Sequence, residues 1–390
     1  MQTLHLKLNR HKRIAAGHLW AFAGEITEKY HQMEPGDPVV LCTAQGKILG
    51  RGYINPHSLI AVRLLTRGDE AWDDQLFQKR INSALKYRES VCTGWEARRL
   101  IYSESDGLPG LIVDQYGDHL VIQSLTAGIE RRLEIITQAM VEIVKPRSIY
   151  LRGDSTYRSL EGLQKRKEAL FGEPPSEITF TENNVNYTAH IIDGQKTGFY
   201  LDQRANREML KGICAGKRIL DLFSYTGAWG IRSLFEGARE AIMVDSSKRV
   251  IEWGMEDALK NNVASKSVFI EADVNEFLDD CQSRGERFDV VILDPPGLIS
   301  SRKHITAGTA VYKALNKKVF MLVTSGGYVV SCSCSHHMSR DNHLTLIGEA
   351  AQRANRHIRL VRSGCQPPDH PILPGHPETD YLKCWLFQCE

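Results

Sequence analysis

Over the first 68 residues, apolar and polar positions alternate in short runs that turn residues separate. This two-residue period predicts β-strands. The predicted strands cover 3–8, 39–41, 48–53 and 59–65, with a turn at 35–38 (Pro-Gly-Asp-Pro). From Asp74 to Glu89 the apolar residues follow helical spacing instead. We therefore expect a small β-barrel over residues 1–72, with a helix leading away from it.

Residues 73–190 mix the two periods. The predicted strands lie at 111–114, 119–125, 148–151, 178–180 and 186–192, and the predicted helix at 130–144. Pro174 and Pro175 interrupt the pattern near the end. This mixture indicates an α+β central domain, although the same pattern also fits an extension of the domain that follows.

From residue 191 to 390 the pattern is that of an α/β fold. The predicted strands are 218–222, 241–245, 268–271, 290–293 and 328–331, and the predicted helices are 227–236, 248–261, 274–284 and 310–323. Strands that alternate with helices indicate a parallel sheet covered by helices. Such sheets bind ligands at the carboxyl ends of their strands, so candidate chemistry is sought there.

Charge separates the first two domains although the chain as a whole carries only +2. Residues 1–68 hold nine basic and four acidic side chains, whereas residues 101–190 hold nine basic and thirteen acidic ones. A basic module is the better candidate for contact with phosphate. With 42% hydrophobic and 25% charged residues, the 390-residue chain does not have the composition of a disordered or fibrous protein.

The sequence contains neither an apolar run long enough to cross a membrane nor the apolar block of a signal peptide. We therefore expect a cytoplasmic protein with no membrane association. The nine cysteines are an odd number spread over a long chain, which argues against a disulfide framework.

Acidic residues stand at the ends of three consecutive predicted strands. Asp221 leads into Phe223-Ser224-Tyr225-Thr226-Gly227, Asp245 ends the next strand and Asp273 follows the third. The phosphate-binding G-x-G-x-x-G motif is missing after the first strand. An acid for ribose and an acid for an adenine amine, without a phosphate cradle, favour S-adenosylmethionine as cofactor. The alternative is that these acids only cap helices.

Two further strand ends suggest methyl transfer to a base. Asp294-Pro295-Pro296-Gly297 follows the fourth strand, where the prolines stiffen a loop that can present a flat base, although a plain turn is the alternative. Cys332 and Cys334 lie in a serine-rich fifth strand end. A thiolate that adds to carbon 6 of a pyrimidine makes carbon 5 nucleophilic. Alternatively the cysteines only pack, or, least favoured because of the spacing, they bind zinc with His336 and His337.

The chain resembles the bacterial RNA large-subunit methyltransferase I family, which uses S-adenosylmethionine to methylate carbon 5 of a cytosine in 23S rRNA. The resemblance spans nearly the whole chain and is carried by the following segments: 18–24 (HLWAFAG), 104–111 (ESDGLPGL), 196–204 (KTGFYLDQR), 223–227 (FSYTG), 294–296 (DPP) and 333–335 (SCS). It implies a PUA-type RNA-binding β-barrel, an α+β central domain and a Rossmann-like class I methyltransferase domain.

The resemblance also implies roles for individual residues. Gln203, Phe223, Asp245 and Asp273 would line the cofactor site, together with Asp221, Ser224, Tyr225, Thr226, Gly227 and Asp294. Cys334 matches the cysteine of the family's Ser-Cys-Ser motif and would be the nucleophile. Asp294 would face the base, with Pro295 and Pro296 beside it. Gly297 replaces the aromatic residue of many amino-group methyltransferases, and no role is assigned to His336 or His337.

For the RNA contact we expect basic and aromatic residues of the barrel: Arg10, Lys12, Arg13, Trp20, Arg51 and Tyr53. The expected partner is 23S rRNA or a large-subunit precursor. A homodimer is compatible with this picture, and no metal is expected. The alternatives are N-methylation of a guanine or adenine in rRNA and a non-catalytic RNA-binding assembly factor; an NAD-dependent oxidoreductase is least favoured.

Overall fold

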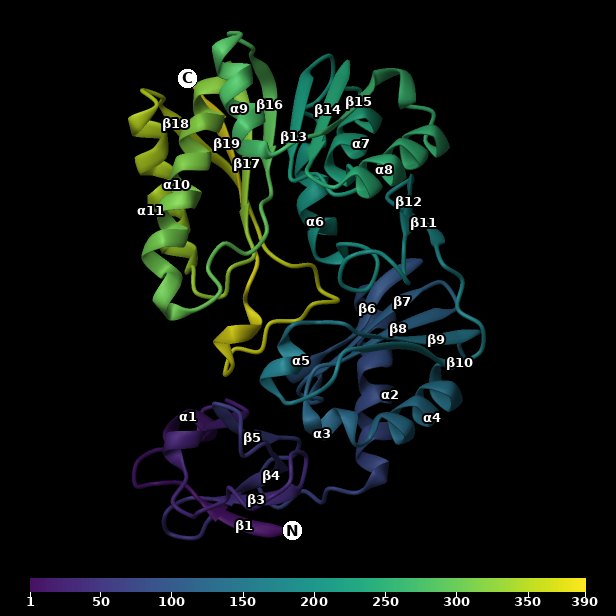
Figure 1. The fold of residues 1–390 in the computed structure, drawn as a ribbon, viewed down its shortest axis with the longest axis vertical. Helices are drawn as coiled ribbons and strands as arrows, with labels where there is room; N and C mark the ends of the chain where they lie inside the picture. Colours follow the sequence, from purple (N-terminus) through teal and green to yellow (C-terminus); the bar gives the residue numbers. More distant parts are fainter. The chain divides into compact units, whose positions relative to one another are not determined.

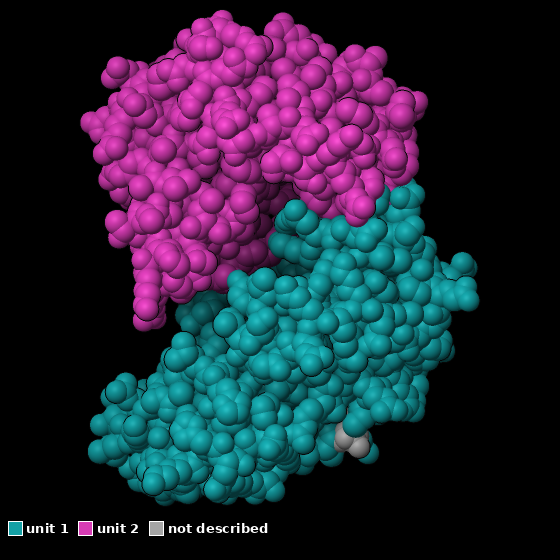
Figure 2. Space-filling model, viewed as in Figure 1, with its two compact units in different colours: residues 1–180, 189–201, 368–379 teal, residues 181–188, 202–367, 380–390 magenta. Residues whose placement is uncertain are grey.

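The computed structural model describes the backbone of residues 1–390 and their side chains, with the exception of the Asp74 side chain. The chain divides into two compact units (Figure 2). Unit 1 consists of residues 1–180, 189–201 and 368–379, and unit 2 of residues 181–188, 202–367 and 380–390. The predicted barrel and most of the predicted central domain thus share unit 1. The boundaries near 72 and 190 stay predictions.

A five-stranded sheet forms the N-terminal part of unit 1, with the strand order β1-β3-β4-β5-β2. Its strands are β1 (Gln2–His5), β2 (Trp20–Phe22), β3 (Pro38–Cys42), β4 (Ile48–Ile54) and β5 (Ile60–Leu64). Alternate residues such as Leu4, Val39, Leu41 and Val62 point into one apolar core, as the period of two requires. The three-residue strand β2 is too short to show that period, which is why it was not predicted.

A second five-stranded sheet, of order β10-β9-β8-β7-β6, forms the rest of unit 1. Its elements are β6 (Ala97–Tyr102), β7 (Leu111–Tyr116), β8 (His119–Ser124), β9 (Ser148–Gly153) and β10 (Arg166–Phe171). Helices α2 (Asp74–Val91) and α4 (Leu133–Val144) pack on this sheet through an apolar core that includes Phe77, Ile81 and Ile136. Strand β10 was not predicted, because its side chains are nearly all exposed and show no apolar alternation.

Unit 2 contains a seven-stranded sheet of order β15-β14-β13-β16-β17-β19-β18 (Figure 1). Its strands are β13 (Arg218–Leu222), β14 (Glu240–Asp245), β15 (Ser267–Glu271), β16 (Phe288–Leu293), β17 (Val323–Ser333), β18 (Ile358–Gly364) and β19 (Lys383–Cys389). The five strands β13 to β17 are parallel, whereas β19 pairs antiparallel with β17 and with β18. The parallel part agrees with the sequence prediction, and the two antiparallel strands were not predicted.

Helices cover both faces of this sheet. They are α7 (Ala228–Phe235), α8 (Lys248–Lys260), α9 (Val274–Ser283), α10 (Ile305–Leu322) and α11 (Arg340–Arg353). Leu220 and Leu222 share one core with α9, α10 and α11, whereas Ile219 belongs to a second core that contains Trp229 of α7. Because both faces are buried, the strands read as continuous apolar runs.

A hairpin of β11 (Ile178–Glu182) and β12 (Val185–Ala189) precedes this sheet in the chain. Glu182 is buried there between two guanidinium groups, and accepts hydrogen bonds from Arg204 at 2.9 Å and from Arg207 at 2.7 Å. Both arginines belong to the short helix α6 (Arg204–Arg207), which directly follows Gln203. This buried ion cluster fixes the backbone that carries Gln203.

The close packing of α8 on β15 generates a stability prediction. A Cβ on Gly254 of α8 would lie 2.4 Å from Phe269 Cε1 and 2.8 Å from the Thr226 carbonyl oxygen. We expect Gly254→Ala to destabilise unit 2 by roughly 1–3 kcal/mol, measured by denaturant unfolding. The matched control is Gly348→Ala in α11, where a Cβ would meet no atom within 4 Å. That change should be neutral or stabilise by up to about 1 kcal/mol. Equal effects of the two changes would contradict the packing argument.

Candidate active site

The loop after β13 holds an unusual backbone. Phe223, Tyr225 and Gly227 have φ values of +59°, +51° and +78°. Residues with a Cβ rarely adopt such angles, and they persist where the surroundings enforce them, often at ligand sites. At Gly227 a Cβ would lie 2.9 Å from Phe269 Cε1, so a glycine is needed for space as well as for conformation. The surroundings thus restrain the backbone of this loop to one conformation up to the start of helix α7.

Three polar atoms around this loop lack a hydrogen-bond partner although they are buried. They are Asp221 Oδ1, Ser224 Oγ and Thr226 Oγ1, whose side chains are 0%, 5% and 0% exposed. Buried polar groups in proteins nearly always find a partner. An adenosine ligand carries hydroxyl and amino groups that can satisfy these atoms. The residues present therefore fit S-adenosylmethionine.

The electrostatics of the same region favour a cation. Burial raises the pKa of Asp221 well above its usual value, and the neighbouring Asp294 and Asp245 raise it further. Burial also raises the pKa of Asp245. Carboxyl groups placed this close are stabilised by a positive charge between them. A sulfonium is such a charge.

Backbone amides orient two of the predicted strand-end acids. The Asp245 carboxylate accepts hydrogen bonds from Tyr225 N and Ser247 N, each at 3.0 Å, and so ties the end of β14 to the β13 loop. Asp273 caps helix α9, because it accepts from Asn275 N at 2.8 Å and from Glu276 N at 3.2 Å. The capping role considered from the sequence is therefore real for Asp273. Its predicted contact with adenine stays a prediction.

The structure brings Asp294 and Gln203 together. Asp294 Oδ2 accepts hydrogen bonds from Gln203 Nε2 at 2.9 Å and from Trp229 Nε1 at 3.2 Å. Asn206 Nδ2 in turn donates to Gln203 Oε1 at 2.6 Å. Sequence reasoning missed Trp229 and Asn206, because neither carries a charge or stands at the end of a strand. After Asp294 the loop buries Pro295 and exposes Pro296.

Cys334 follows directly after β17 and lies beside this loop. A Cβ placed on Gly297 would be 3.7 Å from Cys334 Sγ. The flanking hydroxyls of Ser333 and Ser335 each lie 3.0 Å from the hydroxyl of Tyr312, a buried residue of α10. These contacts hold the half-buried thiol next to the segment that begins with Asp294.

Cys332 has a different environment. Its side chain is 0% exposed, and its Sγ lies 3.3 Å from Cys384 Sγ on the neighbouring strand β19. Burial raises the pKa of Cys332 well above the usual value for a thiol, which disfavours a thiolate. The packing alternative therefore describes Cys332. Within the described residues, Cys332, Cys334, His336 and His337 do not form a group with metal-ligand spacing.

The predicted RNA-binding residues of unit 1 differ in how accessible they are. Lys12, the first residue of helix α1 (Lys12–Ala15), and Arg10, in the turn before it, are exposed. Arg13 and Arg51 are half-buried and pair with Glu25 at 2.9 Å and with Asp69 at 2.7 Å. Trp20 is also half-buried, and its Nε1 donates to Glu104 at 2.8 Å.

Tyr53 departs from the prediction of an RNA contact. Its side chain is 1% exposed, its ring covers Gly128, and its hydroxyl donates to the Pro109 carbonyl oxygen. A ring enclosed in this way has no face for a nucleotide base. Tyr53 belongs to the core of unit 1 that it shares with α2, and the alternating pattern of β4 could not show which neighbour would cover it.

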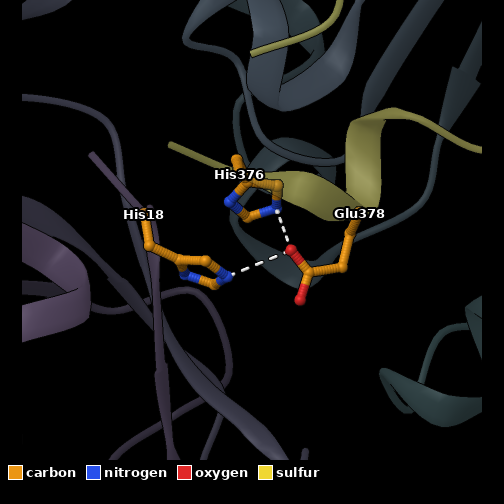
Figure 3. Close-up of side chains that lie close together, drawn as sticks. All are labelled: His18, His376 and Glu378. Atoms are coloured by element: carbon orange, nitrogen blue, oxygen red, sulfur yellow. Dashed lines mark hydrogen bonds and ion pairs between the residues drawn. The ribbon is translucent and has the colours of Figure 1, made fainter. Parts of the chain in front are cut away.

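A second polar cluster of unit 1 has ligand-like spacing (Figure 3). Glu378 Oε2 lies 3.2 Å from His18 Nε2 and 3.8 Å from His376 Nε2. However, Nδ1 of His18 accepts from Trp20 N at 3.0 Å, and Nδ1 of His376 accepts from Leu19 N at 3.4 Å. Both rings therefore carry their proton on Nε2, where His18 donates to the carboxylate of Glu378 and His376 has no hydrogen-bond partner. Metal-bound imidazoles show the opposite pattern, in which the ring's other nitrogen donates a proton.

In this cluster the Glu378 carboxylate accepts a hydrogen bond from His18, whereas His376 Nε2 lies 3.8 Å away, beyond hydrogen-bond distance. The hydrogen bond from His18 lowers the pKa of Glu378 to about 2. Burial lowers the pKa of His376 to about 4, which keeps this ring neutral near pH 7. These interactions attach residues 368–379 to the N-terminal sheet within unit 1.

Comparisons with known proteins agree with this arrangement. Residues 4–67 match the model of a PUA-like domain, and residues 123–388 match that of an S-adenosylmethionine-dependent methyltransferase. The chain is 35% identical to ribosomal RNA large subunit methyltransferase I of Tolumonas auensis, with 98% of each chain covered. It is 36% identical to the protein of that name from Aeromonas salmonicida, with 97% of each covered.

Two solved structures have the same fold. One is described as a SAM-dependent methyltransferase from Streptococcus mutans, and the other as a methyltransferase complexed with SAH. Each superposes on this chain with a TM-score of 0.86 at 20% sequence identity and covers 100% of both chains. The PUA-like N-terminal module and the Rossmann-like methyltransferase fold are confirmed. S-adenosylmethionine is the cofactor. No described helix combines the length and apolar character needed to cross a membrane.

The position of Asp245 beside the β13 loop generates a binding prediction. We expect Asp245→Ala to weaken S-adenosylmethionine binding by about tenfold or more, because charge-assisted hydrogen bonds contribute about 1.5–3 kcal/mol. Calorimetric titration measures the affinity, and a melting curve checks that unit 2 remains folded. Unchanged affinity would remove Asp245 from the cofactor site.

The companion variant Asp273→Ser separates helix capping from ligand binding at that position. Serine caps a helix about as well as aspartate but cannot extend a carboxylate to an adenine. If Asp273 binds the cofactor, affinity falls while stability is kept.

Proposed function

Because the chain belongs to the ribosomal RNA large subunit methyltransferase I family, we propose that it methylates carbon 5 of a cytosine in 23S rRNA through a covalent adduct of Cys334. The observation that carries this proposal is the position of Cys334. Its thiol is half-buried and lies beside Gly297 of the Asp-Pro-Pro-Gly loop. A reaction at an exocyclic amine needs no thiol at this position.

The residues that would hold the cofactor surround the ends of β13 and β14. Asp221, Ser224 and Thr226 present buried atoms without partners, and Asp245 is oriented by backbone amides. Phe223, Tyr225, Gly227, Gln203 and Asp273 complete the proposed lining. When bound, S-adenosylmethionine supplies a methyl group activated by a sulfonium.

The chemical task of Cys334 follows from the electronic structure of cytosine. Its sulfur adds to carbon 6 and forms a C–S bond, while the electrons of the 5,6 double bond make carbon 5 nucleophilic. After methylation, loss of the proton from carbon 5 restores the double bond and expels the sulfur as a thiolate. Cys334 is thus regenerated with its electron pair.

Asp294 is assigned to orient the base. Hydrogen bonds from Gln203 and Trp229 fix the direction of its carboxylate. While Cys334 attacks carbon 6 of a cytosine, a carboxylate on the neighbouring loop can accept a hydrogen bond from the exocyclic amino group of that base. The exposed Pro296 and the buried Pro295 stiffen the loop between these two groups.

The strongest alternative is N-methylation of a guanine or adenine in rRNA. It would use the same cofactor site and Asp294, but it would leave Cys334 without a chemical task. A non-catalytic assembly factor would not need three partnerless polar atoms around a conformationally restrained loop. Gly297, which offers no ring for stacking, also favours the carbon-5 reaction.

Removal of the thiol tests the mechanism. We expect Cys334→Ala to lower methyl transfer to 23S rRNA on the order of 10³-fold or more, because alanine cannot form the covalent bond to carbon 6. Bisulfite sequencing of the rRNA reads out carbon-5 methylation, and calorimetry should show normal S-adenosylmethionine binding. The matched control, Cys332→Ala, should retain most activity. Transfer of a radiolabelled methyl group to the rRNA that survives in both variants, without a bisulfite-resistant cytosine, would favour N-methylation.

For the RNA contact we propose the exposed residues Arg10 and Lys12. Phosphate contacts set affinity and make it depend on salt. We expect Arg10→Glu combined with Lys12→Glu to weaken rRNA binding and to flatten its salt dependence. The control is Lys29→Glu with Lys47→Glu, which changes the charge equally at other exposed positions of the same module. Equal effects of the two pairs would show that only net charge matters.

A further inference from the structure

A buried lysine lies next to the candidate nucleophile. Lys383 is the first residue of β19 and pairs with Ser333 of β17. Its side chain is only 1% exposed. The ammonium Nζ donates hydrogen bonds to the carbonyl oxygens of Ser335 at 2.7 Å and of Tyr381 at 2.6 Å.

Burying the Lys383 ammonium in this way costs free energy, which a purely structural role does not explain. In the described part of the chain Lys383 forms no ion pair with a carboxylate, and both of its hydrogen-bond partners are neutral carbonyls. Buried charges are normally paired, because removing an ion from water costs several kcal/mol. The attraction of an anion that forms nearby during the reaction would offset this free energy. Cys334, one residue before Ser335, can become such an anion.

The same contacts fix the position of Cys334. Lys383 holds the Ser335 carbonyl on one side of the cysteine, and Tyr312 contacts the hydroxyls of both flanking serines. The thiol therefore sits in a segment anchored from β19 and from α10. Gly297 places no side chain against the thiol, whereas a Cβ there would be in van der Waals contact with Sγ at 3.7 Å.

We propose that Lys383 is a positioning residue that holds Cys334 as a thiolate and so prepares it to attack the base. This inference rests on the proposed function. The S–H bond breaks, its electron pair stays on sulfur and the proton passes to solvent. Lys383 stays protonated during this step. It contributes its positive charge and its hydrogen bond to the Ser335 carbonyl oxygen.

The charged and titratable groups around Lys383 agree with this role. Burial lowers its pKa to about 8, while Cys334 and Asp380 oppose that shift and Arg340 of α11 adds to it. His343 of α11 has its pKa lowered to about 3 by burial and is neutral. Tyr312 has a raised pKa and is also neutral. Near pH 7 Lys383 is therefore a cation, and it loses that charge as the pH rises through about 8.

The test measures thiol reactivity without any RNA. The full-length protein is alkylated with iodoacetamide from pH 5 to 10, and mass spectrometry follows the rate at each cysteine. A short unstructured peptide with one cysteine, alkylated in the same mixture, serves as the reference thiol, because burial raises the pKa of the protein's own Cys365. We expect the midpoint for Cys334 to lie at least about one pH unit below that of the peptide thiol. In Lys383→Met the Cys334 midpoint should rise by about one unit or more, so that its rate at pH 7 falls about tenfold.

The pH profile separates charge from structure. A displaced Cys334 would change the plateau of its alkylation rate at high pH. Loss of the cation instead shifts the pH midpoint of this rate and leaves the plateau unchanged. Lys383→Arg, which keeps the charge, should restore a low midpoint. Lys313→Met is the control, because Lys313 belongs to α10 and pairs with Glu349 instead. Calorimetry with S-adenosylmethionine confirms that each variant is folded.

An unchanged midpoint in folded Lys383→Met overturns the inference, as does a Cys334 midpoint in the unaltered protein that is no lower than that of the peptide thiol. Failure of the proposed function looks different. In that case Cys334→Ala still methylates rRNA, while the effect of Lys383 on the thiol can persist.

Discussion

The rest of the site depends on three carboxyl groups that lie close together at one edge of the parallel sheet, because their buried negative charge has to be stabilised there. Asp221 is the penultimate residue of β13, Asp245 ends β14 and Asp294 follows β16. Burial, and to a smaller extent repulsion from Asp294 and Asp245, raises the pKa of Asp221 well above its usual value. Such a cluster is tolerated because each acid receives fixed donors: Gly230 N for Asp221, two backbone amides for Asp245, and Gln203 with Trp229 for Asp294. The remaining negative potential suits a cationic cofactor.

The same edge also separates two cysteines that look alike in sequence. Cys332 lies within β17 and packs against β19, where burial keeps it a thiol. Two residues later the strand has ended, and Cys334 emerges beside Gly297 with a buried ammonium group attached to its neighbour. Cys332 and Cys334 thus differ in role, one as a packing residue and the other as the proposed nucleophile, because β17 ends between them.

Unit 1 shows how the C-terminal part of the chain contributes to the N-terminal part. Residues 368–379 leave the methyltransferase sheet between β18 and β19 and join unit 1. There Asp369 accepts a hydrogen bond from Arg99 N, and Glu378 accepts one from His18 Nε2. Three buried or partly buried partners of this segment are thus separated from it by more than 250 residues of sequence. Pattern analysis has no access to such pairings, since each side chain reads locally as an ordinary polar residue.

The sequence by itself determined the parallel part of the methyltransferase sheet and the acidic residues that stand near its strand ends. The alternation of β13 to β17 with helices and the sites of Asp221, Asp245 and Asp294 follow from periodicity and from the rule that ligands bind where parallel strands end. Tertiary structure decided the rest: that Tyr53 is enclosed, that Asp273 caps α9, that Trp229 meets Asp294, and that Lys383 reaches Ser335. The physical reason is that periodicity reports which face of an element is buried, whereas a partner's identity depends on which distant segment packs against that face.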